Sequence, residues 1–143
     1  MYNKNSNSYH FYFGGVHMQK RSRQRELLLE ILQGTACHPD ADWVFSHMRE
    51  KMPNVSLGTV YRNLSRLAEE GVILKLDVGQ SADRFDGCAV PHYHLACREC
   101  GAVVDLPMAY APHLDKNAAV ESGCEIERHS LLFFGKCPSC TGV

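Results

Sequence analysis

Two Cys-x-x-Cys pairs constrain this 143-residue chain more than any other feature of its sequence. Cys97 pairs with Cys100 and Cys137 pairs with Cys140; each pair follows an expected strand and has a turn residue close by. Two such corners that face each other place four thiolates around one Zn²⁺ at about 2.3 Å, the closed tetrahedral arrangement of a structural site. We therefore predict a structural zinc site, with two local disulfides or a thioredoxin-like redox pair as the alternatives.

The overall composition is that of a small globular protein. Hydrophobic residues make up 45% of the chain and charged residues 22%, which excludes a disordered or fibrous protein. A length of 143 residues allows one domain or two small ones and excludes a multi-domain enzyme. Every apolar stretch is far shorter than the roughly 20 residues of a membrane span, and a secretory signal is lacking. We expect a cytoplasmic protein without a membrane segment, whose reduced thiols bind metal.

The N-terminal half has the pattern of three helices followed by a β-hairpin. Apolar residues recur at helical spacing in three successive segments, and Asp40 and Ser56 precede the second and third segments as N-caps. Two short strands then flank a turn at Gly79. Together these elements make a winged helix, the helix-turn-helix variant that places one helix in the major groove of DNA. The expected helices span residues 22–34, 40–53 and 56–71, and the expected strands span 72–77 and 81–86.

The C-terminal half predicts a small domain of mixed helix and sheet. Strands are expected over 92–97, 102–107 and 125–135, and a helix over 108–122 with Pro112 in its first turn. The fold class is therefore α+β.

Three parts of the chain follow from these patterns. Residues 1–17 lack any helical or strand period, and we expect a leader outside the fold, disordered or not native, before a natural start at Met18. Residues 18–85 form the winged-helix domain and residues 86–143 form the second domain.

A second group of metal-binding residue types lies near the junction of these parts. In the His92-x-His94 motif both imidazoles lie on one face of a strand, because side chains alternate along it. Each residue alone has an ordinary role as a loop or turn residue. If all converge, they form a nitrogen and oxygen site that suits Fe²⁺ or Mn²⁺ and couples ion binding to domain orientation. The group comprises His38, Asp86, His92, His94 and Asp105.

The third expected helix carries the residues suited to reading DNA. Arginine and asparagine read base edges, and tyrosine reaches the thymine methyl group or phosphate. A solvated charged face is the ordinary interpretation of a lone helix, and the net charge of −1 does not by itself indicate nucleic acid. The position of this helix before a wing favours DNA. Our candidate DNA contacts are Lys20, Ser56, Thr59, Tyr61, Arg62, Asn63 and Arg66.

These residues together resemble the ferric uptake regulator (Fur) family of metal-dependent bacterial repressors. The resemblance runs from about Lys20 to Cys140, and it implies a winged helix followed by an α/β dimerisation domain. It further implies a homodimer that is not an enzyme and binds palindromic operator DNA as a repressor. The motifs that carry it are HPDADWVF (38–45), PNVSLGTVYRNL (53–64), RFD (84–86), HYHLACRECG (92–101), VVDL (103–106) and CPSC (137–140).

Within the family, the chain is most similar to the peroxide-sensing PerR branch. Iron and zinc uptake regulators commonly have Glu where this chain has Asp86 or Asp105. The PerR resemblance implies that Fe²⁺ at the site reacts with H₂O₂ and oxidises His38 or His92 to 2-oxo-histidine, after which the repressor leaves DNA. Five protein ligands leave one coordination position for peroxide, whereas Mn²⁺ supports DNA binding without sensing.

Three rival functions stay open. An iron or zinc uptake regulator keeps the fold and lacks the peroxide chemistry. A thiol redox enzyme would use the Cys-x-x-Cys pairs. A metal-dependent hydrolase at the His and Asp residues lacks an evident general base in so short a chain.

Overall fold

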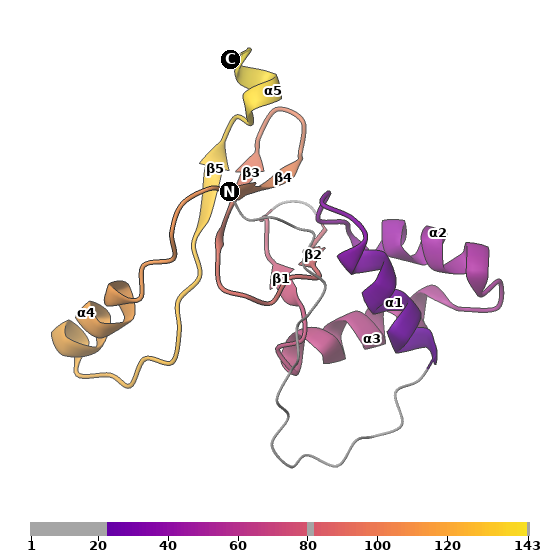
Figure 1. The fold of residues 1–143 in the computed structure, drawn as a ribbon, viewed down its shortest axis with the longest axis horizontal. Coiled ribbons are helices and arrows are strands. Elements are labelled where there is room, and N and C mark those ends of the chain that lie inside the picture. The colour runs from indigo at the N-terminus through magenta and orange to yellow at the C-terminus, as the bar shows by residue number, and fades with distance from the viewer. Residues whose placement is uncertain (1–22, 80–81, 143) are drawn as a thin grey trace.

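The computed structural model describes residues 23–79 and 82–142, and it begins with three helices (Figure 1). These are α1 (Arg23–Gln33), α2 (Ala41–Lys51) and α3 (Leu57–Glu69). Asp40 accepts a hydrogen bond from the Trp43 N–H at 2.8 Å, and Ser56 accepts one from the Thr59 N–H at 3.2 Å, so both residues are N-caps as predicted. The helices bury their apolar faces against one another in a shared core.

A two-stranded antiparallel wing follows α3. It consists of β1 (Leu74–Leu76) and β2 (Arg84–Asp86), with Leu74 opposite Asp86. Both strands are shorter than expected, and β1 starts late because Val72 and Ile73 donate their N–H groups to the Leu67 carbonyl near the end of α3. Three helices and a wing make the predicted winged helix.

A three-stranded mixed sheet forms the second half. Its strands are β3 (Tyr93–Cys97), β4 (Val103–Leu106) and β5 (Leu132–Gly135), in the order β4-β3-β5. The central strand β3 runs antiparallel to β4 and parallel to β5. The predicted α+β fold class is confirmed.

The connection between β4 and β5 departs most from expectation. Its helix α4 (His113–Ser122) starts later than predicted, since the Ala111 N–H is bound by the Tyr93 hydroxyl at 2.9 Å. Residues 125–131 are not in a strand, because β3 begins only at Tyr93 and offers no ladder partner further upstream. Helix α4 lies away from the sheet (Figure 1), and each of its residues is at least partly exposed. A short helix, α5 (Pro138–Thr141), ends the described part of the chain and was not predicted.

Some predictions about the organisation of the chain are not tested by the structure. Residues 1–17 and Lys20 lie outside the described residues. The assignment of residues 18–85 and 86–143 to two domains stays a prediction. Over the described ranges, we find no helix both long and apolar enough to cross a membrane.

Candidate metal centres

Two groups of metal-binding side chains come together in the described part of the chain. Within each group, every residue offers one donor atom that lies within 4.8 Å of the donors of all the others. The thiol cluster consists of Cys97, Cys100, Cys137 and Cys140, and the His/Asp cluster consists of His38, Asp86, His92, His94 and Asp105.

Two backbone corners build the thiol cluster. Cys97 ends β3, and the turn after it is closed by the Gly101 N–H, which donates to the Cys97 carbonyl at 3.0 Å. Gly101 takes φ +73°, a conformation that favours glycine. The second corner caps α5, where the Cys140 N–H donates to the Cys137 carbonyl at 2.9 Å. The Sγ atoms of Cys100 and Cys137 lie 3.7 Å apart, and all four thiols are free.

The electrostatics of the thiol cluster fit a bound cation. Backbone N–H groups of Cys100 and Cys137 point at the Cys97 sulfur and lower its pKa to about 6. Hydrogen bonds with the other three sulfurs raise the pKa of Cys140 to about 12. One thiolate therefore forms readily and the last forms only with help from a positive charge. Four closely spaced thiolates are the donor set that Zn²⁺ prefers.

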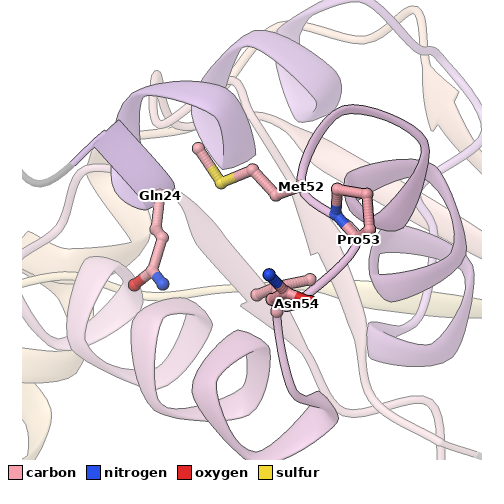
Figure 2. A pocket seen from close by; sticks show the side chains of 5 residues that line it. Gln24, Met52, Pro53 and Asn54 are labelled. Carbon is pink, nitrogen blue, oxygen red and sulfur yellow. The ribbon is translucent and has the colours of Figure 1, made fainter.

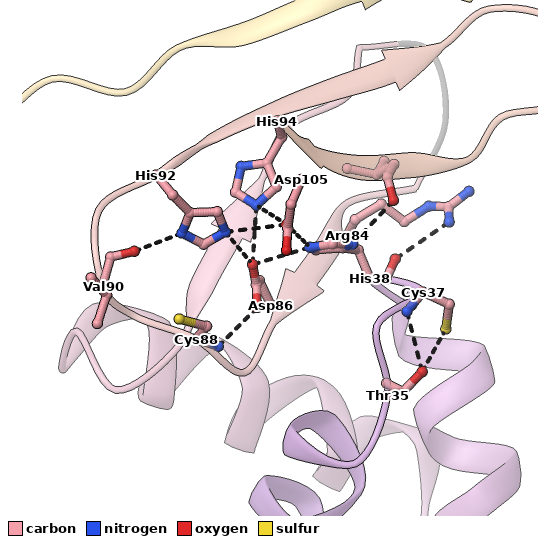
Figure 3. A network of polar contacts seen from close by, with 11 residues as sticks. Thr35, Cys37, His38, Arg84, Asp86, Cys88, Val90, His92, His94 and Asp105 are labelled. Carbon is pink, nitrogen blue, oxygen red and sulfur yellow. Dashed lines mark hydrogen bonds and ion pairs between the residues drawn. The ribbon is translucent and has the colours of Figure 1, made fainter. Parts of the chain in front are cut away.

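Four segments of the chain supply the His/Asp cluster (Figure 3). His38 lies in the loop between α1 and α2, Asp86 ends β2, His92 and His94 come from β3 and its approach, and Asp105 lies on β4. Asp86 Oδ2 is 3.1 Å from His38 Nε2 and 3.0 Å from each of the other two Nε2 atoms. Asp105 Oδ1 lies 2.8, 3.2 and 3.4 Å from the Nε2 atoms of His38, His92 and His94.

Backbone groups orient three of these side chains toward the centre. The Nδ1–H of His38 donates to the Val103 carbonyl at 3.0 Å, and that of His92 donates to the Val90 carbonyl at 2.6 Å. Asp86 Oδ1 accepts the Cys88 N–H at 2.8 Å, so Oδ2 is left for the cluster. A carbonyl only accepts, so in the neutral forms of His38 and His92 the Nε2 atom carries the lone pair.

With that tautomer, nitrogen lone pairs would face carboxylate oxygens across the centre unless a proton or a cation lies between them. The donors are crowded around one point, and the ring centroids of His92 and His94 lie 4.3 Å apart. A divalent cation satisfies all five donors at once. The mixed nitrogen and oxygen set fits Fe²⁺ or Mn²⁺.

The cluster is mostly buried and contains a charged carboxylate, as a cation site requires. His38 and His94 are buried, whereas the Asp105 side chain is 43% exposed. Burial acts to raise the pKa of Asp86, but hydrogen bonds from His38 and His94 outweigh it and hold that pKa well below its usual range. Burial likewise acts to lower the pKa of His38, while the hydrogen bond and charge of Asp86 raise it on balance. Asp86 is thus an ionised carboxylate inside the protein.

His38 reaches the cluster through an uncommon backbone conformation. Its φ is +48°, and no other non-glycine residue of the described ranges has a positive φ. Such a residue costs about 1–3 kcal/mol and persists only where its surroundings hold it. The supporting groups are mostly backbone carbonyls and N–H groups, which carry no sequence signal. Arg84, whose Nη1 lies 3.4 Å from the His38 carbonyl, was likewise missed by the sequence prediction.

The candidate DNA contacts line the start and the outer face of α3. Tyr61, Arg62 and Arg66 are exposed, and Thr59 and Asn63 are partly exposed. Arg62 donates to the Thr59 hydroxyl at 3.1 Å, which in turn lies 2.9 Å from the hydroxyl of the N-cap Ser56.

A hollow beside the start of α1 belongs to neither cluster. It measures about 290 Å³ and lies between the start of α1 and the turn before α3 (Figure 2). None of the residues that line it is a cysteine, a histidine or a carboxylate. The lining residues are Gln24, Met52, Pro53, Asn54 and Val55.

A winged helix joined to a mixed sheet, with one thiol cluster and one His/Asp cluster, defines a class of DNA-binding fold with two candidate ion sites. The chain belongs to the ferric uptake regulator family, whose sequence model matches residues 17–134. The peroxide operon regulator of Bacillus subtilis is 35% identical over 118 residues, which are 82% of this chain and 81% of that protein. The peroxide-responsive repressor PerR of Staphylococcus epidermidis is 30% identical over 117 residues, 82% of this chain and 78% of that protein.

Solved structures give the same relationship. The Campylobacter jejuni peroxide stress regulator superposes with a TM-score of 0.72 at 28% identity, covering 82% of this chain and 88% of that one. The Helicobacter pylori ferric uptake regulator superposes with a TM-score of 0.68 at 26% identity, covering 85% and 82% of the two chains.

Proposed function

We propose that this chain is a homodimeric transcriptional repressor that binds operator DNA when Fe²⁺ or Mn²⁺ occupies the His/Asp cluster. It senses hydrogen peroxide through Fe(II)-catalysed oxidation of His38 or His92. The observation that carries the proposal is the 2.8 Å contact between His38, which comes from the helices, and Asp105, which comes from the sheet. An ion held there ties the DNA-reading helices to the sheet. The names of the relatives above support the peroxide signal.

The carboxylates and the imidazoles of the His/Asp cluster have different roles in sensing. Asp86 and Asp105 supply negative charge, and the three imidazoles supply neutral donors. Fe²⁺ held by these five residues would supply the reducing chemistry that activates peroxide. His38 and His92 present their rings next to that position, so an oxygen atom added to either ring weakens its donor nitrogen. Loss of His38 frees the loop before α2 and with it the position of α3.

The thiol cluster has a separate, structural role. We assign it one Zn²⁺ held by Cys97, Cys100, Cys137 and Cys140, which fixes the end of β3 to the start of α5. We place the protein in the cytoplasm, where such thiols stay reduced.

A second copy of the chain covers the exposed apolar residues of the sheet. Strand β5 is an edge strand, and Phe133 and Phe134 on it are 39% and 50% exposed. Pairing of two identical edges gives a two-fold contact, which matches a palindromic operator read by α3 of each copy. Sedimentation will show a dimer for the wild type and a weaker one for Phe134→Asp.

One experiment tests the proposal as a whole. A palindromic duplex is selected from a random library with the Mn²⁺-loaded protein, and its affinity is measured with Mn²⁺ and with Fe²⁺, before and after H₂O₂. We expect binding with both metals and loss of binding only for the Fe²⁺ protein after H₂O₂. Mass spectrometry should then find one added oxygen in the peptide that contains His38 or His92.

The same measurement decides against the nearest alternative. The likeness to the Helicobacter pylori ferric uptake regulator favours an iron or zinc uptake regulator as the second candidate. Such a regulator binds DNA in response to metal and shows unmodified histidines after H₂O₂.

A further inference from the structure

Arg84 contacts the backbone of His38, in the His/Asp cluster, and of Gly101, the residue after Cys100 of the thiol cluster. It is on β2, two residues before Asp86, and its side chain is half-buried (Figure 3). Its Nη1 donates to the His38 carbonyl at 3.4 Å, and its Nη2 donates to the Gly101 carbonyl at 3.2 Å. Gly101 closes the turn of the first Cys-x-x-Cys pair. One guanidinium group thus joins the loop of the His/Asp cluster to the corner of the thiol cluster.

The His38 segment needs such support. Its positive φ is held by three contacts: the ring with the Val103 carbonyl, the Pro39 carbonyl with the Phe85 N–H at 2.9 Å, and the His38 carbonyl with Arg84. The carbonyls of His38 and Pro39 accept from the Arg84 guanidinium and the Phe85 N–H, and of these two donors the guanidinium is the one that belongs to a side chain.

The Arg84 side chain keeps this position although its Nε has no hydrogen-bond partner. Within residues 23–79 and 82–142, Arg84 Nε is the buried side-chain nitrogen or oxygen that lacks a hydrogen-bond partner. A buried N–H without an acceptor is costly, and such a group in a folded protein calls for an explanation. The explanation is that the other two nitrogens of the guanidinium bind the carbonyls of His38 and Gly101.

We propose that Arg84 is a positioning residue that couples the two metal centres by holding His38 in its ligating conformation. This inference rests on the proposed function and names a device inside it. Zn²⁺ at the thiol cluster orders the turn that presents the Gly101 carbonyl. Arg84, bound to that carbonyl, holds the His38 carbonyl in place. The His38 ring is thereby kept in position as the fifth donor of the His/Asp cluster. Because binding linkage is reciprocal, an ion at the His/Asp cluster also strengthens retention of zinc.

The first test asks whether Arg84 acts through His38. Zinc-loaded wild type, Arg84→Met, His38→Ala and the double variant are titrated with Co²⁺, whose visible absorption reports its coordination. Arg84→Met should bind Co²⁺ about tenfold more weakly or worse, the cost typical of losing a group that orients a ligand. It should show the spectrum of His38→Ala, and the double variant should be no weaker than His38→Ala alone. Wild-type affinity for Arg84→Met, or additive losses in the double variant, would overturn the proposal.

The second test measures the coupling between the centres. Release of zinc to a chelator is timed with and without Mn²⁺. In the wild type Mn²⁺ should slow the release, and in Arg84→Met it should have no effect. An equal slowing in both proteins, or no slowing in the wild type, would overturn the coupling.

Two further variants keep these outcomes interpretable. Lys75→Met removes a cation from the same wing, where Lys75 pairs with Asp83 at 3.0 Å, and it should behave as wild type. Arg84→Lys keeps the charge but lacks the planar fork that reaches both carbonyls, so it should show a loss of the same kind if Arg84→Met fails to fold. Absence of any Co²⁺ or Mn²⁺ site in the wild type would instead refute the proposed function.

Discussion

At the residue scale, the His/Asp cluster depends on the length and direction of single side chains. Asp86 reaches the centre with one oxygen because the Cys88 N–H holds the other at 2.8 Å. Asp105 approaches from the solvent side with 43% of its side chain exposed, whereas His38 and His94 are buried. The short side chain of Asp105 therefore lies on the exposed side of the cluster, the side that a dissolved molecule such as peroxide reaches first.

Asp105→Glu tests the importance of that short side chain. The added methylene moves the carboxylate into the open side of the cluster, so we expect Mn²⁺-dependent operator binding to persist and histidine oxidation under Fe²⁺ and H₂O₂ to fall. Operator titration and peptide mass spectrometry measure the two effects. If the variant is oxidised as fast as the wild type, the length of this side chain does not matter.

Gly87→Ala tests how closely the residue after Asp86 must pack. A Cβ at this position would lie 2.9 Å from the Leu32 carbonyl carbon and 3.0 Å from the Gln33 nitrogen, backbone atoms of α1. We expect a loss of about 1–3 kcal/mol in the free energy of unfolding, as for other overpacked sites, together with weaker Mn²⁺ binding. Gly58→Ala is the control, because its Cβ would meet only the far end of the Arg62 side chain at 3.4 Å and alanine favours a helix. Equal stability of the two variants would contradict this packing.

At the element scale, α3 and the strand order of the sheet set what each half can do. Helix α3 buries Val60, Leu64 and Leu67 against the core and leaves its arginines on the outer face. Central strand β3 directly follows His92, carries His94 and ends in Cys97, so one strand contributes to both metal centres. Its neighbour β4 adds Asp105 opposite His94, which places these two donors together through the register.

Arg62→Ala tests the role of α3 in DNA binding. If Arg62 contacts phosphate, its loss should weaken binding to all sequences and reduce the slope of log affinity against log salt by about 1. If it reads a base, the loss should relax specificity at one position of the operator by about 1–3 kcal/mol. Lys51→Ala is the control, since Lys51 lies on α2 and pairs with Glu30 at 2.8 Å. Unchanged affinity and specificity for Arg62→Ala would contradict a role of this face in DNA binding.

At the scale of the whole molecule, the thiol cluster anchors the sheet and its charge state makes stability depend on pH. Hydrogen bonds lower the pKa of Cys97 from 9.0 to about 6 in the folded protein. A lowered folded-state pKa contributes stability that is present above the pKa of the unfolded chain and is lost as pH falls through the folded value. In the zinc-free protein this contribution therefore grows between about pH 6 and pH 9.

Zinc removal combined with Cys97→Ser tests this dependence. We expect the free energy of unfolding of the zinc-free wild type, relative to that of zinc-free Cys97→Ser, to rise over this pH interval. Urea unfolding at several pH values measures the difference. A constant difference would mean that the Cys97 thiolate is not stabilised by the backbone N–H groups around it.

Sequence patterns alone determined most of the elements and the residue types of both donor sets. The helical periods, the caps Asp40 and Ser56, the Cys-x-x-Cys pairs and the His92-x-His94 motif are local, because each depends on residues only a few positions apart. The tertiary structure alone decided the positive φ of His38, the two backbone contacts of Arg84 and the shortening of the strand that ends at Gly135. These features depend on which backbone groups long-range packing brings opposite one another, and a backbone carbonyl or a missing ladder partner leaves no mark in the sequence.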